Sequence, residues 1–189
     1  QISGFNMAYV DINGDRRLDI IAASTKALFW LEQPADINAG WVAHEIGTFL
    51  PDSITGLISA DINDDGYTDV LAGSYSRGDR ENEADIGVDN PLGRLGWFEH
   101  PGAHGKSWTR HDISRRKRGM FDKFVAIDMD NDGDTDFVST RGNSGIFDGV
   151  FWLEQVRTSV PNKAFAGARG NESKSMPLPT QSAAREKHR

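Results

Sequence analysis

The chain has 189 residues, of which 38% are hydrophobic and 26% are charged, a composition typical of a globular protein with its own core. Its net charge of −7 argues against a nucleic-acid partner, and no apolar run approaches the roughly 18 residues of a membrane-spanning helix. The lack of cysteine excludes disulfides, thiolate metal sites and a cysteine nucleophile.

In chain order, short segments rich in β-branched and aromatic residues alternate with clusters of Gly, Asn, Asp and Pro, which predicts strands and turns. Six predicted strands flank three acidic loops and cover residues 5–10 and 19–24, 54–60 and 69–74, and 121–127 and 136–140. A third strand of each unit contains Trp30, Trp97 or Trp152, and a fourth, in the first two units, contains His44 or His111. No segment shows a convincing helical stripe, so the sequence predicts an all-β protein.

The three acidic loops define an internal repeat. They are the nine-residue segments 11–19, 61–69 and 128–136, each with Asp at positions one, five and nine and Asp or Asn at position three. Without their twelve Asp residues the net charge would change from −7 to +5. A Trp-Leu-Glu or Trp-Phe-Glu segment follows each loop, and a Trp-x-x-His segment follows in the first two units. The 17 extra residues of the second unit lie between Asp69 and Trp97, which predicts a surface insertion there.

These motifs resemble the FG-GAP or VCBS-type calcium-binding repeats of integrin α heads and secreted bacterial β-propellers. The resemblance covers residues 3–156 and implies three four-stranded antiparallel blades, at about 3–52, 53–119 and 120–156, within a larger ring of about seven blades. Because three blades do not close a ring, we expect the chain to be the C-terminal part of a longer protein whose upstream residues supply the other blades. Residues 157–189 are polar and basic, and we expect a disordered or loosely packed tail.

The resemblance also implies the metal ligands. In this spacing, side chains at positions one, three, five and nine and the backbone carbonyl of position seven offer oxygen to Ca²⁺, which prefers six to eight such ligands. The implied ligands of the first loop are Asp11, Asn13, Asp15, Arg17 and Asp19. Those of the second loop are Asp61, Asn63, Asp65, Tyr67 and Asp69. Those of the third loop are Asp128, Asp130, Asp132, Asp134 and Asp136.

We expect up to three calcium sites, of which the first is the weakest. Position six needs a positive φ and holds Gly66 or Gly133 in two loops but Arg16 in the first, where Arg16 and Arg17 also subtract negative charge. An EF-hand would place Glu at position twelve, and the chain has Ala22, Ala72 or Ser139 there.

Other residues have competing interpretations. The repeated tryptophans are predicted to form core between blades rather than sugar-stacking platforms, and the repeated histidines to be strand residues rather than catalytic bases. The insertion at residues 75–93 is interpreted as a solvated flap or a recognition loop. The basic run at residues 115–118 is interpreted as a solvated linker or a contact to an anionic partner.

The sequence favours a non-catalytic, calcium-binding propeller scaffold that binds a carbohydrate or a surface protein outside the cell, at the cell surface or in the periplasm. One alternative is the propeller of a calcium-dependent polysaccharide lyase or another carbohydrate-active enzyme. Another is an integrin-like adhesion module. No nucleophile and base with a recognisable spacing support the enzyme interpretation.

Overall fold

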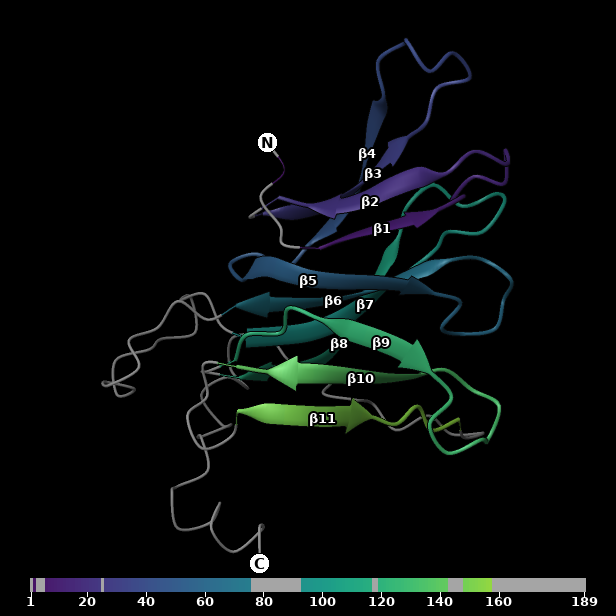
Figure 1. Ribbon diagram of the computed structural model, residues 1–189. Helices are drawn as coiled ribbons and strands as arrows, with labels where there is room; N and C mark the ends of the chain where they lie inside the picture. The colour runs from purple at the N-terminus through teal and green to yellow at the C-terminus, as the bar shows by residue number, and fades with distance from the viewer. Residues whose placement is uncertain are drawn as a thin grey trace, which may run out of the picture.

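The computed structural model of the protein describes residue 2 and residues 6–24, 26–75, 93–116, 119–142 and 148–157. The described residues form three antiparallel sheets (Figure 1). The first sheet contains β1 (Met7–Val10), β2 (Asp19–Ala23), β3 (Ala27–Glu32) and β4 (Val42–Thr48). The second contains β5 (Ser53–Ala60), β6 (Asp69–Tyr75), β7 (Gly93–Glu99) and β8 (Thr109–Arg116). The third contains β9 (Phe124–Ile127), β10 (Asp136–Arg141) and β11 (Gly149–Leu153).

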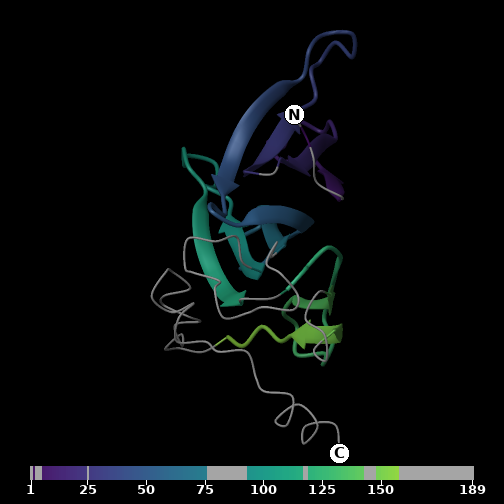
Figure 2. The same ribbon diagram turned by 90° about the vertical axis from the view of Figure 1, so that its left-hand side faces the viewer.

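The sheets are stacked in chain order, with the first at the top and the third at the bottom of Figure 2. Within each sheet consecutive strands are hydrogen-bonded neighbours, and the first strands β1, β5 and β9 contact one another from sheet to sheet. This is the arrangement of successive propeller blades, which confirms the predicted all-β architecture. The three sheets do not close into a ring within the described residues.

Two apolar cores lie between the sheets. The first joins the first two sheets and includes Ile21 and Leu28 from one side and Val70 and Phe98 from the other. The second joins the second and third sheets and includes Leu71, Phe121 and Phe137. Burial of these side chains is the main force that holds one sheet on the next.

The repeated tryptophans lie against these cores between sheets in two of the three units. Trp30 packs against the first core and Trp97 against the second, as predicted for residues between blades. Trp152 is 43% exposed, so the prediction is wrong for the third unit within the described residues. The reason is that no further described sheet lies on that face of β11.

Three other expectations change. The third sheet has three described strands rather than four. Its first strand begins at Phe124 rather than at residue 121, because Phe121 is used to fill the core between sheets. Arg115 belongs to strand β8 and is buried, so the basic run begins inside the fold and not in a solvated linker.

Two interpretations cannot be compared with the structure. Most of the insertion at residues 75–93 and most of the tail at residues 157–189 lie outside the described residues. In the part of the chain that is described, no helix is long and apolar enough to cross a membrane.

Candidate metal centre

The three acidic loops connect the first and second strands of their sheets and lie along one side of the stack, on the right in Figure 1. The first strand of each sheet runs into its loop, and the Asp at position nine begins the second strand. Because each sheet has the same order of strands, each carries its acidic loop on the same side of the stack. The fold therefore places fifteen predicted ligand residues on one edge of the molecule.

The Asp at position nine is buried in all three loops: Asp19, Asp69 and Asp136 are at most 1% exposed. One carboxylate oxygen accepts a hydrogen bond from the backbone N–H at position two, at 3.0–3.1 Å. The other accepts a bond from the backbone N–H of the residue after the Trp-x-Glu segment, at 2.7–2.8 Å. This carboxylate thus joins the loop to the end of the third strand.

Burial of these carboxylates has an electrostatic cost. Burial raises the pKa of Asp69 to about 6, although the backbone N–H groups of His100 and Ile62 act in the opposite direction. Burial likewise raises the pKa of Asp19, and the nearby charges of Asp15 and Asp11 add to the effect. A divalent cation in the loop would offset this cost, since an adjacent positive charge favours the ionised form.

The Asp at position one closes each loop by accepting backbone hydrogen bonds. Asp11 accepts from Arg16 at 2.7 Å, Asp61 from Gly66 at 2.9 Å and Asp128 from Gly133 at 3.1 Å. The backbone donor is position six in all three loops, so the loops share one conformation. A carboxylate that accepts backbone hydrogen bonds in this way is a common means of closing a turn.

The predicted positive φ at position six is confirmed. The angle is 85° at Gly66, 95° at Gly133 and 68° at Arg16, where a side chain makes it unfavourable. Position four also has a positive φ, at Gly14, Asp64 and Asn131. That second constraint was not predicted, although the residue types were a signal, since Gly, Asn and Asp tolerate this region best.

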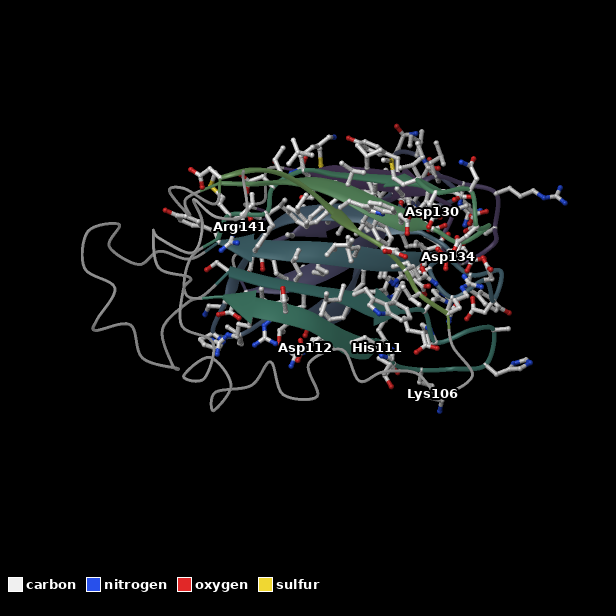
Figure 3. The ribbon with its side chains drawn as sticks, turned by 90° about the horizontal axis from the view of Figure 1, so that it is seen from below. Lys106, His111, Asp112, Asp130, Asp134 and Arg141 are labelled. Atoms are coloured by element: carbon white, nitrogen blue, oxygen red, sulfur yellow. The ribbon has the colours of Figure 1, made fainter. Side chains whose placement is uncertain are left out.

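In the third loop the carboxylates converge. One oxygen from each of Asp128, Asp130 and Asp136 lies within 4.8 Å of the other two. Figure 3 shows the labelled Asp130 and Asp134 at the same end of the molecule, opposite Arg141. Asp132 is outside this group, and its Oδ1 accepts the N–H of Asp134 at 3.1 Å.

This donor set fits Ca²⁺. All the converging atoms are carboxylate oxygens, the ligands preferred by a hard cation, and two of the three residues are exposed to solvent from which an ion enters. The side chain of Asp134 is buried, and its Oδ1 has no hydrogen-bond partner among the described residues. The sequence predicted only the backbone carbonyl of Asp134 as a ligand, so the side chain adds negative charge beside the site.

The first two loops are arranged differently at position three. The Asn13 amide nitrogen lies 3.1 Å from an Asp15 oxygen, and the equivalent distance from Asn63 to Asp65 is also 3.1 Å. In the first loop the Arg17 guanidinium also pairs with Asp15. This ion pair lowers the negative charge available in the first loop. The ranking of the three loops by affinity stays a prediction.

Comparison with known proteins identifies the repeat. Residues 11–72 match the FG-GAP-like repeat family. This part of the chain is similar to an FG-GAP-like repeat, which is consistent with a protein built from repeats of that type. The match spans about a third of the chain and contains the first two acidic loops, and the third loop shares their spacing. Neither the curated proteins nor the solved structures gave a match.

Each of the first two units also links its loop to the third and fourth strands. In the first unit Asn13 donates to Glu32 at 3.3 Å, and Glu32 pairs with His44 at 2.9 Å. His44 in turn stacks on Trp30, with ring centroids 4.2 Å apart. The histidine is therefore a repeated structural residue, as its position predicted, while the contact of the glutamate with the loop was not predicted.

The second unit repeats these contacts closely. Asn63 donates to Glu99 at 3.3 Å, Glu99 pairs with His111 at 2.7 Å, and His111 stacks on Trp97 at 4.3 Å. The conserved geometry of the two units shows why the Trp-x-Glu and Trp-x-x-His segments recur at a fixed distance from the loop. They form a support that orients position three.

Proposed function

We propose that this protein is a non-catalytic propeller-type scaffold whose loops bind Ca²⁺ and which binds its ligand outside the cell. The observation that carries the proposal is the convergence of Asp128, Asp130 and Asp136 in the third of three equivalent loops. Buried, hydrogen-bonded carboxylates at position nine support it, because they connect the loop to two strands of the sheet. Extracellular fluid contains enough calcium to fill sites of modest affinity.

The residues of the loop would have two tasks. Asp128, Asp130 and Asp136 would hold the ion, and the ion would supply positive charge that removes the repulsion among them. Through Gln155, whose N–H donates to Asp136 at 2.8 Å, the ordered loop would also fix the end of the third strand. Calcium would thus stabilise the sheets that carry the binding surface rather than act in a reaction.

The test is thermal unfolding in calcium and in chelator. At a calcium concentration 100 times the Kd, one site stabilises the fold by about 2.7 kcal/mol, which corresponds to a rise in Tm of about 5–10 °C. We expect at least this rise for the natural protein, and a rise smaller by the contribution of one site for the D130A/D132A variant. Asp36→Ala, which removes an exposed carboxylate outside the loops, is the matched control and should keep the full rise.

Magnesium at equal ionic strength separates binding from screening. Mg²⁺ demands a tighter octahedral shell, so its effect on the Tm should be small. An equal rise with both ions, or an equal rise in D130A/D132A and the natural protein, would refute the proposal.

A further inference from the structure

A cleft lies between the first and second sheets, on the side of the acidic loops. Its volume is about 700 Å³, within the range of small-molecule sites. One wall is formed by the first loop together with His44 and Glu45 of β4. The other is formed by Tyr67 of the second loop and by parts of the segment 100–108. Both walls therefore belong to elements that calcium would order.

Five aromatic rings line this cleft. Tyr67 stacks on His100 with ring centroids 5.0 Å apart and an angle of 6°, and Trp108 meets His100 edge-on at 4.9 Å. On the opposite wall Trp30 stacks on His44. Trp30 and Trp108 also pack against the first core, so their orientation is fixed before any ligand arrives. Tyr67 is 36% exposed and offers part of its ring to the cleft.

Polar side chains accompany these rings. Glu45 supplies a hydrogen-bond acceptor on the first wall, beside Asp11 and Asn13 of the calcium loop, and Lys106 supplies a donor on the second. Carboxylates and an ammonium group on facing walls give the cleft mixed charge, without a strong preference for ligands of one sign.

The next pair of sheets shows what distinguishes this cleft. Between the second and third sheets, Gln155 donates to the carbonyl of Ile62 at 2.9 Å, and Arg157 pairs with Asp64 and lies 3.8 Å from Asp134. These side chains span the equivalent space with hydrogen bonds and charge.

In the first pair of sheets, the corresponding positions have different chemistry. Arg157 is replaced by Gly102, Asp64 by Gly14 and Asp134 by Tyr67, as the equivalent loop positions show. Gly102 has no side chain to span the gap, and a Cβ there would lie 3.8 Å from the Tyr67 ring. A paired charge in one interface thus corresponds to an open aromatic surface in the other.

We infer that the cleft between the first two sheets binds a saccharide. A sugar ring has an apolar C–H face, which packs on aromatic rings, and hydroxyls, which bond to carboxylate and amide groups of the kind found here. A cationic ligand fits less well, because the two carboxylates that hold Arg157 in the neighbouring interface are replaced by Gly14 and Tyr67. The inference rests on the proposed function, since the calcium loops form both walls.

The experiment measures binding to the calcium-loaded full chain. The probes are methyl glycosides of glucose, galactose, mannose, fucose, N-acetylglucosamine and glucuronic acid, with N-acetyl-lysine methylamide as a basic side-chain probe. Binding is followed by tryptophan fluorescence and by saturation-transfer NMR. We expect at least one glycoside to bind, and Tyr67→Ala to weaken it at least tenfold. Tyr67→Phe, which keeps the ring, should stay within about threefold.

Controls separate the cleft from the metal sites. Tyr9→Ala removes an aromatic ring that is 59% exposed and does not line the cleft, and it should leave glycoside binding unchanged. Because Tyr67 also belongs to the second calcium loop, a calcium titration of both Tyr67 variants shows whether that loop still binds its ion. Lack of glycoside binding, equal binding by Tyr67→Ala, or binding of the lysine probe alone would overturn the saccharide assignment. Any of these outcomes with a normal calcium titration would leave the proposed calcium scaffold standing.

Discussion

Asp52 is the most informative single residue for testing how the second sheet is held together. It is fully buried and precedes β5, and it accepts hydrogen bonds from Arg94 Nε at 2.8 Å and from Arg115 Nε and a terminal nitrogen at 2.9 Å. Arg94 and Arg115 are 3% and 1% exposed. Arg94 also pairs with Asp112 at 2.6 Å. The network therefore joins the approach to the first strand of the sheet to its third and fourth strands.

Replacing Asp52 by Ala leaves two buried guanidinium groups with one fewer carboxylate. Removal of one partner from a buried ion pair costs about 3–5 kcal/mol, because the remaining charge loses its compensation without regaining water. Since Asp112 still faces Arg94, we expect the lower end of this range. A loss of about 3 kcal/mol corresponds to a fall in Tm of about 6–12 °C for a chain of this size.

The assay is thermal unfolding by circular dichroism, in calcium and in chelator. The fall should be the same in both buffers, because none of these four residues belongs to an acidic loop. The triple variant D52L/R94M/R115M removes three of the four charges together and leaves Asp112 paired with Arg110. It should recover at least half of the loss, since a buried ion network is often replaceable by apolar side chains. A fall of less than about 2 °C in D52A, or a triple variant less stable than D52A, would refute the reasoning.

Three further predictions concern stability. Arg16→Gly relieves a positive φ of 68° and should raise the free energy of unfolding in chelator by about 1 kcal/mol. It should also lower the Kd of the first calcium site, as measured by calorimetry. No change in either quantity would contradict the loop geometry. Burial raises the pKa of Asp122, so the stability contributed by its protonated carboxyl is present below the unfolded pKa of about 4 and is lost as the pH rises through the folded pKa. Asp122→Asn should therefore raise the Tm at pH 7 and not at pH 3. An equal rise at both pH values would count against burial as the cause. Gly56→Ala places a Cβ 2.3 Å from the Phe121 carbonyl oxygen and should lower the free energy of unfolding, measured by chemical denaturation, by about 1–3 kcal/mol. Gly40→Ala, whose Cβ would have no atom within 4 Å, should lower it little. Equal effects of the two variants would mean that the sheets separate easily.

Local features of the sequence predicted most of the fold. Each acidic loop has turn residues at fixed offsets, and the flanking segments have strand composition, so both the loop and its hairpin could be located. The positive φ at Gly66 and Gly133 followed from the same local reasoning and is confirmed. The repeat then extended each local prediction to the other units, which is why strand assignments agreed to within a few residues.

Contacts between residues distant in the chain were not predictable in this way. Asp52 is separated from Arg94 by 42 residues and from Arg115 by 63, and nothing in the composition around Asp52 indicates that it is buried. The Arg115 segment was interpreted as a linker for the same reason, because a basic run predicts solvent exposure unless the compensating carboxylate is known. The contact from Asn13 to Glu32 depends on strand pairing and became visible only with the sheet.

One face of the third sheet is exposed, although the equivalent faces of the first two sheets are buried by a neighbouring sheet. Trp30, Trp97 and Trp152 occupy equivalent positions, and the first two are covered by the following sheet. On the face of Trp152, Val125 is 50% and Val150 75% exposed, because no further described sheet packs there. In a stacked repeat, each unit interacts only with its neighbours, so the sequence of a unit specifies its own sheet and the apolar character of its two faces. Whether a face is buried is then a property of the array, and identical sequence positions acquire different exposure according to their place in it.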